Sequence, residues 1–97
     1  MKIGTRARYS LRLMMAIARL AADGHPLGLM KAARYTGISH RYAEQLVAPL
    51  RKAGLIRAVS GRGGGYLLER PSSEIRVGEI IEAAMGVAHE EPVDVDL

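Results

Sequence analysis

The sequence predicts one mainly α-helical domain with a small β-hairpin, in the layout of a winged helix-turn-helix. Apolar residues recur at helical spacing in the first half of the chain. Gly37 stands four residues after the small Ala33, between two of these helical segments. Two short strand-like segments then flank the glycine-rich stretch 61–65. With 97 residues, 48% of them hydrophobic, the chain is long enough for one domain and apolar enough to fold.

The first helix is predicted from Thr5 to Ala22. Thr5 is a suitable N-cap, and the apolar positions from Leu11 onward form a broad face. Arg8, Arg12 and Arg19 form a narrow basic stripe on the same helix. The Asp-Gly-His-Pro segment 23–26 is expected to end it, with the glycine at C′.

The next two segments are predicted to form the helix-turn-helix itself. A short helix runs from Leu27 to Thr36, Gly37 allows a tight turn, and Ser39 caps a helix that extends from His40 to Ala53. Pro49 is expected to kink or loosen the helix 40–53, because proline lacks the N–H that a helix interior needs. Gly54 ends the helix.

One side of the third helix is polar, and in a helix-turn-helix this side enters the DNA major groove. Arg41 suits guanine, Glu44 suits the cytosine amine and Gln45 suits adenine. His40 and Lys52 suit phosphates. An ordinary solvated helix face would carry similar residues, so the turn spacing and the positive charge are what favour DNA.

Leu55 to Ser60 and Tyr66 to Glu69 are predicted to be the two strands of the hairpin. A nucleotide-binding P-loop is excluded, because that loop needs Gly-Lys-Ser/Thr followed by a helix. The glycines instead suit a wing tip with Arg62 at its apex, shaped for a narrow minor groove. A turn over 71–73 and a last helix from Val77 to Met85 complete the fold.

Charge is distributed unevenly. Residues 1–85 contain all 14 Lys and Arg against six Asp and Glu, a formal charge of +8, whereas the last twelve residues contain four acids. A basic body of this size indicates a polyanionic partner, although solubility alone also favours such charge. Further phosphate contacts are expected from Lys2, Arg6, Arg8, Arg51 and Arg57.

Several function classes are disfavoured. The absence of cysteine rules out disulfides, thiolate zinc sites and cysteine-ligated iron–sulfur clusters within this sequence. The three histidines lack metal-ligand spacing, and we find no nucleophile–base pair, so neither a metal site nor enzymatic activity is expected. No signal peptide or membrane-spanning apolar run is evident, and a cytoplasmic location is expected.

Six motifs together resemble the Rrf-two family of bacterial regulators, which includes the IscR, NsrR and CymR types. They are TRARYSLR at 5–12, GIS at 37–39, YAEQL at 42–46, PLRKAGLI at 49–56, GGGYLL at 63–68 and EIRVGEII at 74–81. The resemblance covers residues 1–86 and implies a winged helix-turn-helix that binds palindromic operators as a homodimer. It also implies that Arg41 and Glu44 read bases and that the wing, with Ser60, Arg62 and Gly63, enters the minor groove.

The chain departs from the family pattern in two places. Ser60 stands where relatives often have arginine, and Arg62 replaces a proline, so the wing charge has moved toward the tip. Many members also carry three cysteines after about residue 90 and then a dimerisation helix. Either the chain is cut before these elements or the protein lacks the sensor. The acidic segment 87–97 resembles the lead-in to that region, which favours the first alternative; an iron–sulfur cluster would require a cysteine-bearing extension.

The sequence thus predicts a DNA-binding transcriptional regulator, with repression as the expected direction of control. Two alternatives remain open: a winged helix that serves as a protein-interaction module, and an RNA-binding protein. The sequence does not specify the operator, the regulated genes or the signal.

Overall fold

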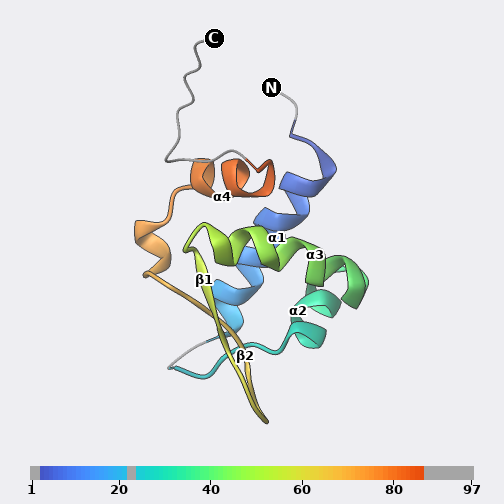
Figure 1. Cartoon of the computed structure of the whole chain (residues 1–97), viewed down its shortest axis with the longest axis vertical. Coiled ribbons are helices and arrows are strands. Elements are labelled where there is room, and N and C mark those ends of the chain that lie inside the picture. The colour runs from blue at the N-terminus through green and yellow to red at the C-terminus, as the bar shows by residue number, and fades with distance from the viewer. Residues whose placement is uncertain (1–2, 22–23, 87–97) are drawn as a thin grey trace.

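A computed structural model describes residues 3–21 and 24–86, which form four α-helices, one 3-10 turn and a two-stranded antiparallel sheet (Figure 1). This architecture confirms the predicted winged helix-turn-helix. The helices and strands, in chain order, are α1 (Thr5–Leu20), α2 (Leu29–Thr36), α3 (His40–Lys52), β1 (Ile56–Val59), β2 (Gly65–Leu68), η1 (Ser72–Glu74) and α4 (Val77–Ala84).

Helix α1 begins and ends differently from the prediction. Gly4, not Thr5, is the N-cap residue, and its carbonyl accepts the first helical hydrogen bond from the Arg8 N–H at 3.0 Å. Thr5 is already helical, and no side-chain cap bond is made at this end. The helix stops at Leu20 because Ala21 adopts an extended conformation, before the segment predicted to end it.

Leu27 forms an isolated β-bridge and is not the start of α2. It pairs with Tyr66 of β2 through two backbone hydrogen bonds, 3.0 Å from the Leu27 N–H and 2.9 Å from the Tyr66 N–H. The pairing holds Leu27 extended, and Gly28, also extended, is the N-cap of the helix that begins at Leu29. The loop before α2 is therefore joined to the hairpin by an isolated β-bridge, which the sequence did not predict.

A single cluster of buried aliphatic side chains holds the helices and the base of the hairpin together. Its members come from α1, α2, α3, β1, α4 and the adjoining segments: Leu13, Met14, Ala16, Ile17, Leu27, Ala32, Leu46, Val47, Leu50, Leu55, Ile56, Ile80 and Ala83. Met14 is in this core, whereas its neighbour Met15 is 47% exposed.

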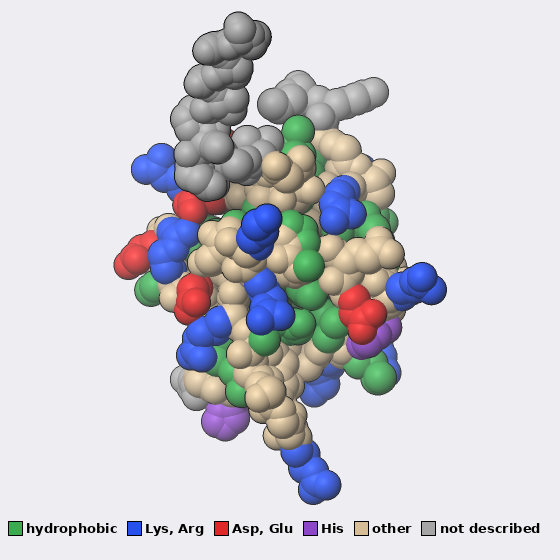
Figure 2. Space-filling view, viewed as in Figure 1, with side chains coloured by type: hydrophobic (Ala, Val, Ile, Leu, Met, Phe, Trp, Pro, Cys, Tyr) green, Lys and Arg blue, Asp and Glu red, His purple; other side chains and the backbone are tan. Residues whose placement is uncertain are grey.

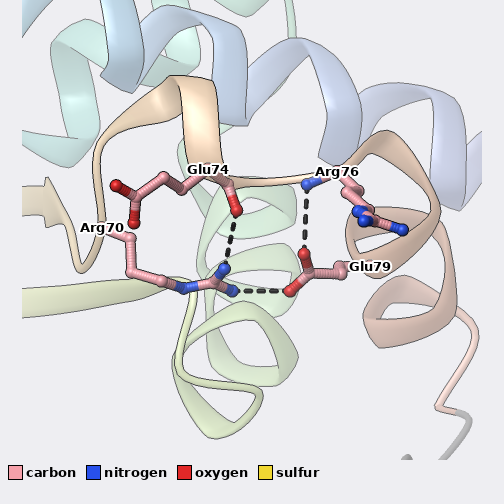
Figure 3. Close-up of polar contacts among 4 residues, drawn as sticks. All are labelled: Arg70, Glu74, Arg76 and Glu79. Carbon is pink, nitrogen blue, oxygen red and sulfur yellow. Dashed lines mark hydrogen bonds and ion pairs between the residues drawn. The ribbon is translucent and has the colours of Figure 1, made fainter.

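The base of the hairpin is joined to α4 by Arg70 and Glu79 (Figure 3). Arg70 donates one hydrogen bond to the Glu74 main-chain carbonyl at 2.8 Å and another to the Glu79 carboxylate. The other Glu79 oxygen accepts from the Arg76 N–H at 3.1 Å, at the N-terminus of α4. One carboxylate thus caps a helix and anchors the chain that leaves β2.

We expect Gly65→Ala to disrupt the pairing of Leu27 with the hairpin. A Cβ at position 65 would lie 2.2 Å from the Leu27 carbonyl oxygen, which is part of the backbone and has little room to move. The substitution should lower the free energy of unfolding by roughly 1–3 kcal/mol, as overpacking does. Urea denaturation would measure this change. Gly78→Ala is the matched control, since a Cβ at that helical position meets nothing within 4 Å; an equal loss in both variants would contradict the assignment.

Glu79 should make stability depend on pH. Its hydrogen bond from Arg70, followed by that from the Arg76 backbone, lowers the pKa of Glu79 below its ordinary value of 4.5. The stabilisation is therefore complete above about pH 4.5 and is lost as the pH falls through the lowered folded-state pKa. Thermal denaturation between pH 7 and pH 3 should show a weaker acid dependence for Glu79→Gln than for the wild type. Glu74→Gln is the control, because it leaves the main-chain carbonyl that Arg70 contacts.

Candidate nucleic-acid interface

The turn between α2 and α3 is built by backbone hydrogen bonds around Gly37. The Gly37 N–H donates to the Ala33 and Arg34 carbonyls at 2.8 and 3.2 Å, and the Ile38 N–H donates to Ala33 at 3.0 Å. This is a Schellman motif, which requires a left-handed residue where Gly37 has φ 83°. Ala33, 3% exposed, is buried at the same turn. The predicted helix-turn-helix junction is thus confirmed in its geometry.

Ser39 starts α3, as predicted: its side-chain oxygen accepts from the Tyr42 N–H at 3.0 Å. Four apolar residues of α3 face the core, namely Ala43, Leu46, Val47 and Leu50. Burial of this face leaves the opposite side of the helix in solvent. Seven residues on that side are exposed, and they include every residue that the sequence predicts for DNA contact on this helix: His40, Arg41, Glu44, Gln45, Ala48, Arg51 and Lys52.

His40 and Glu44 lie one helical turn apart on this exposed face. The His40 Nδ1 and Glu44 Oε2 atoms are 3.7 Å apart, and the two side chains are 49% and 59% exposed. Such an exposed contact is weak and readily exchanged for another partner. Both side chains therefore stay available to an external ligand.

Aromatic and basic side chains of α1 flank α3. The rings of Tyr9 and Tyr42 pack edge to face with centroids 6.3 Å apart. The guanidinium groups of Arg8 and Arg12 lie 5.5 and 5.2 Å from the centroid of the Tyr9 ring. Arg8 and Arg12 of α1 thus lie next to α3 and extend the basic surface beyond that helix. Arg12 was not among the predicted site residues, although its place in the stripe was the signal that pointed to it.

The hairpin projects from the helices (Figure 1), and a basic side chain extends from its tip (Figure 2). Its register pairs Ile56 with Leu68 and Val59 with Gly65, which leaves the five-residue loop Ser60–Gly64 at the end. Arg62, the one basic residue of this loop, is exposed, as are Ser60 and Gly63.

The conformation of the loop is fixed by its glycines. The Gly64 N–H donates to the Gly61 carbonyl at 3.0 Å, which closes a four-residue β-turn with Arg62 at its second position, and Gly63 at its third position has the left-handed φ of 77°. A Cβ at Gly64 would lie 2.1 Å from the Val59 carbonyl oxygen. The loop is therefore a tight turn that presents one arginine.

Two predicted phosphate contacts have partners within the protein. Arg57 on β1 lies 3.5 Å from Glu69, measured from Nε to Oε1, with both side chains about half exposed. Arg6 donates from Nε to the Ala84 carbonyl at 3.2 Å and from Nη2 to the Gln45 carbonyl at 3.3 Å. Lys2 lies outside the described residues. Of the other predicted site residues, six lie on α3, three in the wing loop 60–64, two on α1 and one on β1.

Within residues 3–21 and 24–86, no helix has the length and apolar character needed to cross a membrane.

The arrangement matches a known family along almost the whole chain. The family model Rrf2, described as iron-dependent transcriptional regulator, matches residues 3–94. The chain belongs to the Rrf2 family. This confirms the resemblance predicted from the six motifs.

Two regulators illustrate the similarity within the Rrf2 family. The HTH-type transcriptional regulator CymR of Bacillus subtilis is 41% identical over 86 residues, which are 89% of this chain and 62% of CymR. The HTH-type transcriptional regulator IscR of Cereibacter sphaeroides is 44% identical over 84 residues, 86% of this chain and 54% of IscR. The chain therefore spans less than two thirds of the length of either regulator.

A solved Rrf2 structure shows the same fold. The structure of CymR (YrzC), described as the global cysteine regulator of B. subtilis, superposes with a TM-score of 0.82 at 38% identity. The match covers 98% of this chain and 71% of that one.

The iron in the family's description raises the question of ligands in this chain. The sequence contains no cysteine. In the part of the chain that the structure describes, no three His, Cys, Asp or Glu side chains are grouped so that they could hold a metal ion. The described residues therefore do not fit a cysteine-ligated cluster.

Proposed function

We propose that this protein is a cytoplasmic transcriptional regulator that binds duplex DNA in a sequence-specific manner and represses transcription. The observation that carries the proposal is the outward-facing polar side of α3, held in place by the Gly37 turn and by four buried residues. Membership of the Rrf2 family, described as transcriptional regulators, supports the same function. The protein's role is binding, not enzymatic catalysis.

Helix α3 is the recognition helix in this proposal. Arg41 donates two hydrogen bonds to guanine O6 and N7, Glu44 accepts from a cytosine amine, and Gln45 pairs with adenine. His40, Arg51 and Lys52 contact phosphates, which orient the helix without reading sequence. All six side chains are exposed on the described surface.

The wing supplies a second contact. Arg62 at the second position of the Gly61–Gly64 turn enters the minor groove, where a narrow groove concentrates negative potential. Ser60 and Gly63, on either side of it, contact the adjacent sugar–phosphate backbone through a hydroxyl and a slim main chain.

The remaining basic residues extend the phosphate contacts. Arg8 is the best placed of them, since its guanidinium lies over Tyr9, which packs against Tyr42 of α3. Arg57 contributes after exchanging Glu69 for a phosphate. Lys2 belongs to the same proposal.

A homodimer on a palindromic operator fits this mode of binding, because two-fold protein symmetry matches two half-sites about one helical turn apart. Within the sequence, 1–86 is the DNA-binding domain and the acidic segment 87–97 leads into a region for sensing or dimerisation. An iron–sulfur cluster would need cysteines that this sequence does not contain.

Selection from a random duplex pool tests the proposal. The protein should enrich a palindromic sequence, and its affinity for the selected duplex should fall steeply with salt through counterion release. Equal enrichment of single-stranded RNA would favour the RNA-binding alternative. If no duplex is bound at about 50 mM salt, the DNA proposal is wrong and a protein partner becomes the better candidate.

Arg62→Ala should weaken binding to the selected duplex, and most strongly where A·T pairs flank the half-sites, because those flanks narrow the minor groove. Fluorescence anisotropy on duplexes with A·T-rich and G·C-rich flanks would measure the difference. Arg62→Lys is the charge-matched control and should retain more affinity than alanine on both. Equal affinity of Arg62→Ala and wild type on every flank would remove Arg62 from the interface.

Glu44→Ala should relax base preference at one position of each half-site. The loss of a hydrogen bond to the cytosine amine corresponds to roughly 1–3 kcal/mol of discrimination. Competition binding against the three substituted base pairs at each position would locate it. Glu69→Ala is the matched control: it removes the same charge from the hairpin and should raise affinity for all duplexes alike. A uniform gain for Glu44→Ala as well would show that Glu44 does not read a base.

A further inference from the structure

One arginine at the start of α1 bonds to main-chain oxygens of two other helices. Arg6 Nε donates to the Ala84 carbonyl of α4 at 3.2 Å, and Nη2 donates to the Gln45 carbonyl of α3 at 3.3 Å. These residues are 78 and 39 positions away in the sequence. The side chain therefore ties together the N-terminal end of α1, the middle of α3 and the C-terminal end of α4.

Both acceptors lack their ordinary helical partner. The Gln45 carbonyl would accept from the N–H four residues later, but that residue is Pro49, which has no N–H and whose ring crowds the same oxygen. Ala84 is the last residue of α4, so its carbonyl is among those that a helix end leaves unsatisfied. Arg6 supplies a donor to each.

The charge of Arg6 also suits its position. Helix α4 has no basic residue in its own last turn, where a cation interacts favourably with the helix dipole. Arg6 brings a guanidinium to that end from a different helix. The planar guanidinium donates in two fixed directions, which lets one side chain reach two separate carbonyls, whereas a lysine offers a single point charge.

We propose that Arg6 is a positioning residue for the recognition helix, and that it acts on the break that Pro49 leaves in the helical hydrogen bonds of α3. The carbonyl that it holds belongs to Gln45, whose side chain is one of the proposed base readers. Without this bond, α3 is free to bend between Gln45 and Pro49, and the second half of the helix, with Arg51 and Lys52, loses its fixed angle to the first half.

This inference replaces the phosphate contact predicted for Arg6. Two of the donor groups of the guanidinium are already used within the fold. A phosphate contact and a positioning role differ in their salt dependence, because only a released counterion changes the slope of affinity against salt.

The link between Arg6 and Pro49 is tested first without DNA, by urea denaturation of Arg6→Ala, Pro49→Ala and the double variant. Pro49→Ala restores an N–H that donates to the Gln45 carbonyl. Arg6→Ala should therefore raise the unfolding equilibrium constant by about tenfold in the wild-type background and about threefold with Ala at 49, where only the Ala84 bond is lost. Equal effects in both backgrounds would overturn the proposal.

The consequence for recognition rests on the proposed DNA-binding function and is measured on a duplex selected from a random pool and on a random-sequence duplex. Arg6→Ala and Arg6→Lys should both lower affinity for the selected duplex by about five- to tenfold. Affinity for random DNA and the salt slope should stay as in the wild type. Adding Pro49→Ala should recover most of the loss.

Arg8→Ala is the matched control from the same helix. Arg8→Ala should reduce the slope of affinity against salt by about one, and adding Pro49→Ala should not restore the lost affinity. If Arg6→Ala behaves in this way and Arg6→Lys binds normally, Arg6 is a phosphate contact and the positioning role is wrong. If the wild type binds no duplex, the DNA-binding proposal fails, while the denaturation cycle still decides whether Arg6 compensates for Pro49.

Discussion

The orientation of α3 depends on the burial of its apolar face against α1. Leu46 and Leu50 of α3 and Leu13 of α1 are each fully buried, and they belong to one cluster with Ile17. Each such side chain contributes about 1.5–3 kcal/mol when it leaves water, so rotating α3 would expose several of them at once. The polar residues of α3 point outward because the free energy lost on rotating the helix would be too large. Their placement therefore follows from the packing of the core and not from their own contacts.

The ends and interruptions of the helices are the second constraint, since each leaves backbone groups without partners. The turn at Gly37 satisfies the carbonyls of α2 through the chain that follows it. Glu79 caps α4 and holds Arg70, and Arg6 supplies donors at Gln45 and Ala84. Long polar side chains thus connect these elements and fix their relative orientation more specifically than the apolar core alone would. The same connections set how the hairpin and α4 lie relative to α3.

Much of this fold could be predicted from the sequence, because the decisive signals are local. The spacing of Ala33, Gly37 and Ser39 defines a turn within seven residues, and the glycines at 61–65 define the wing tip. What the sequence did not reveal depends on partners distant in the chain. Leu27 directly precedes the helical run and was predicted to begin it, but its pairing with Tyr66, 39 residues later, places it in a β-bridge. The hydrogen bonds from Arg6 to the Gln45 and Ala84 carbonyls likewise join residues that are far apart in the sequence.

Partners distant in the sequence also determine which basic side chains are available to bind DNA. Counting Lys and Arg from the sequence treats every cation as equally available to a polyanion, yet the structure divides them by what they already contact. Arg70 is held by Glu79, Arg57 lies beside Glu69, and Arg6 bonds to two carbonyls. Among residues 3–21 and 24–86, the basic side chains of α3 and of the wing tip make no ion pair with an acidic side chain, apart from the weak contact of His40 with Glu44. The net charge of the domain therefore describes long-range attraction to DNA, whereas specific recognition rests on the smaller set that α3 and Arg62 present.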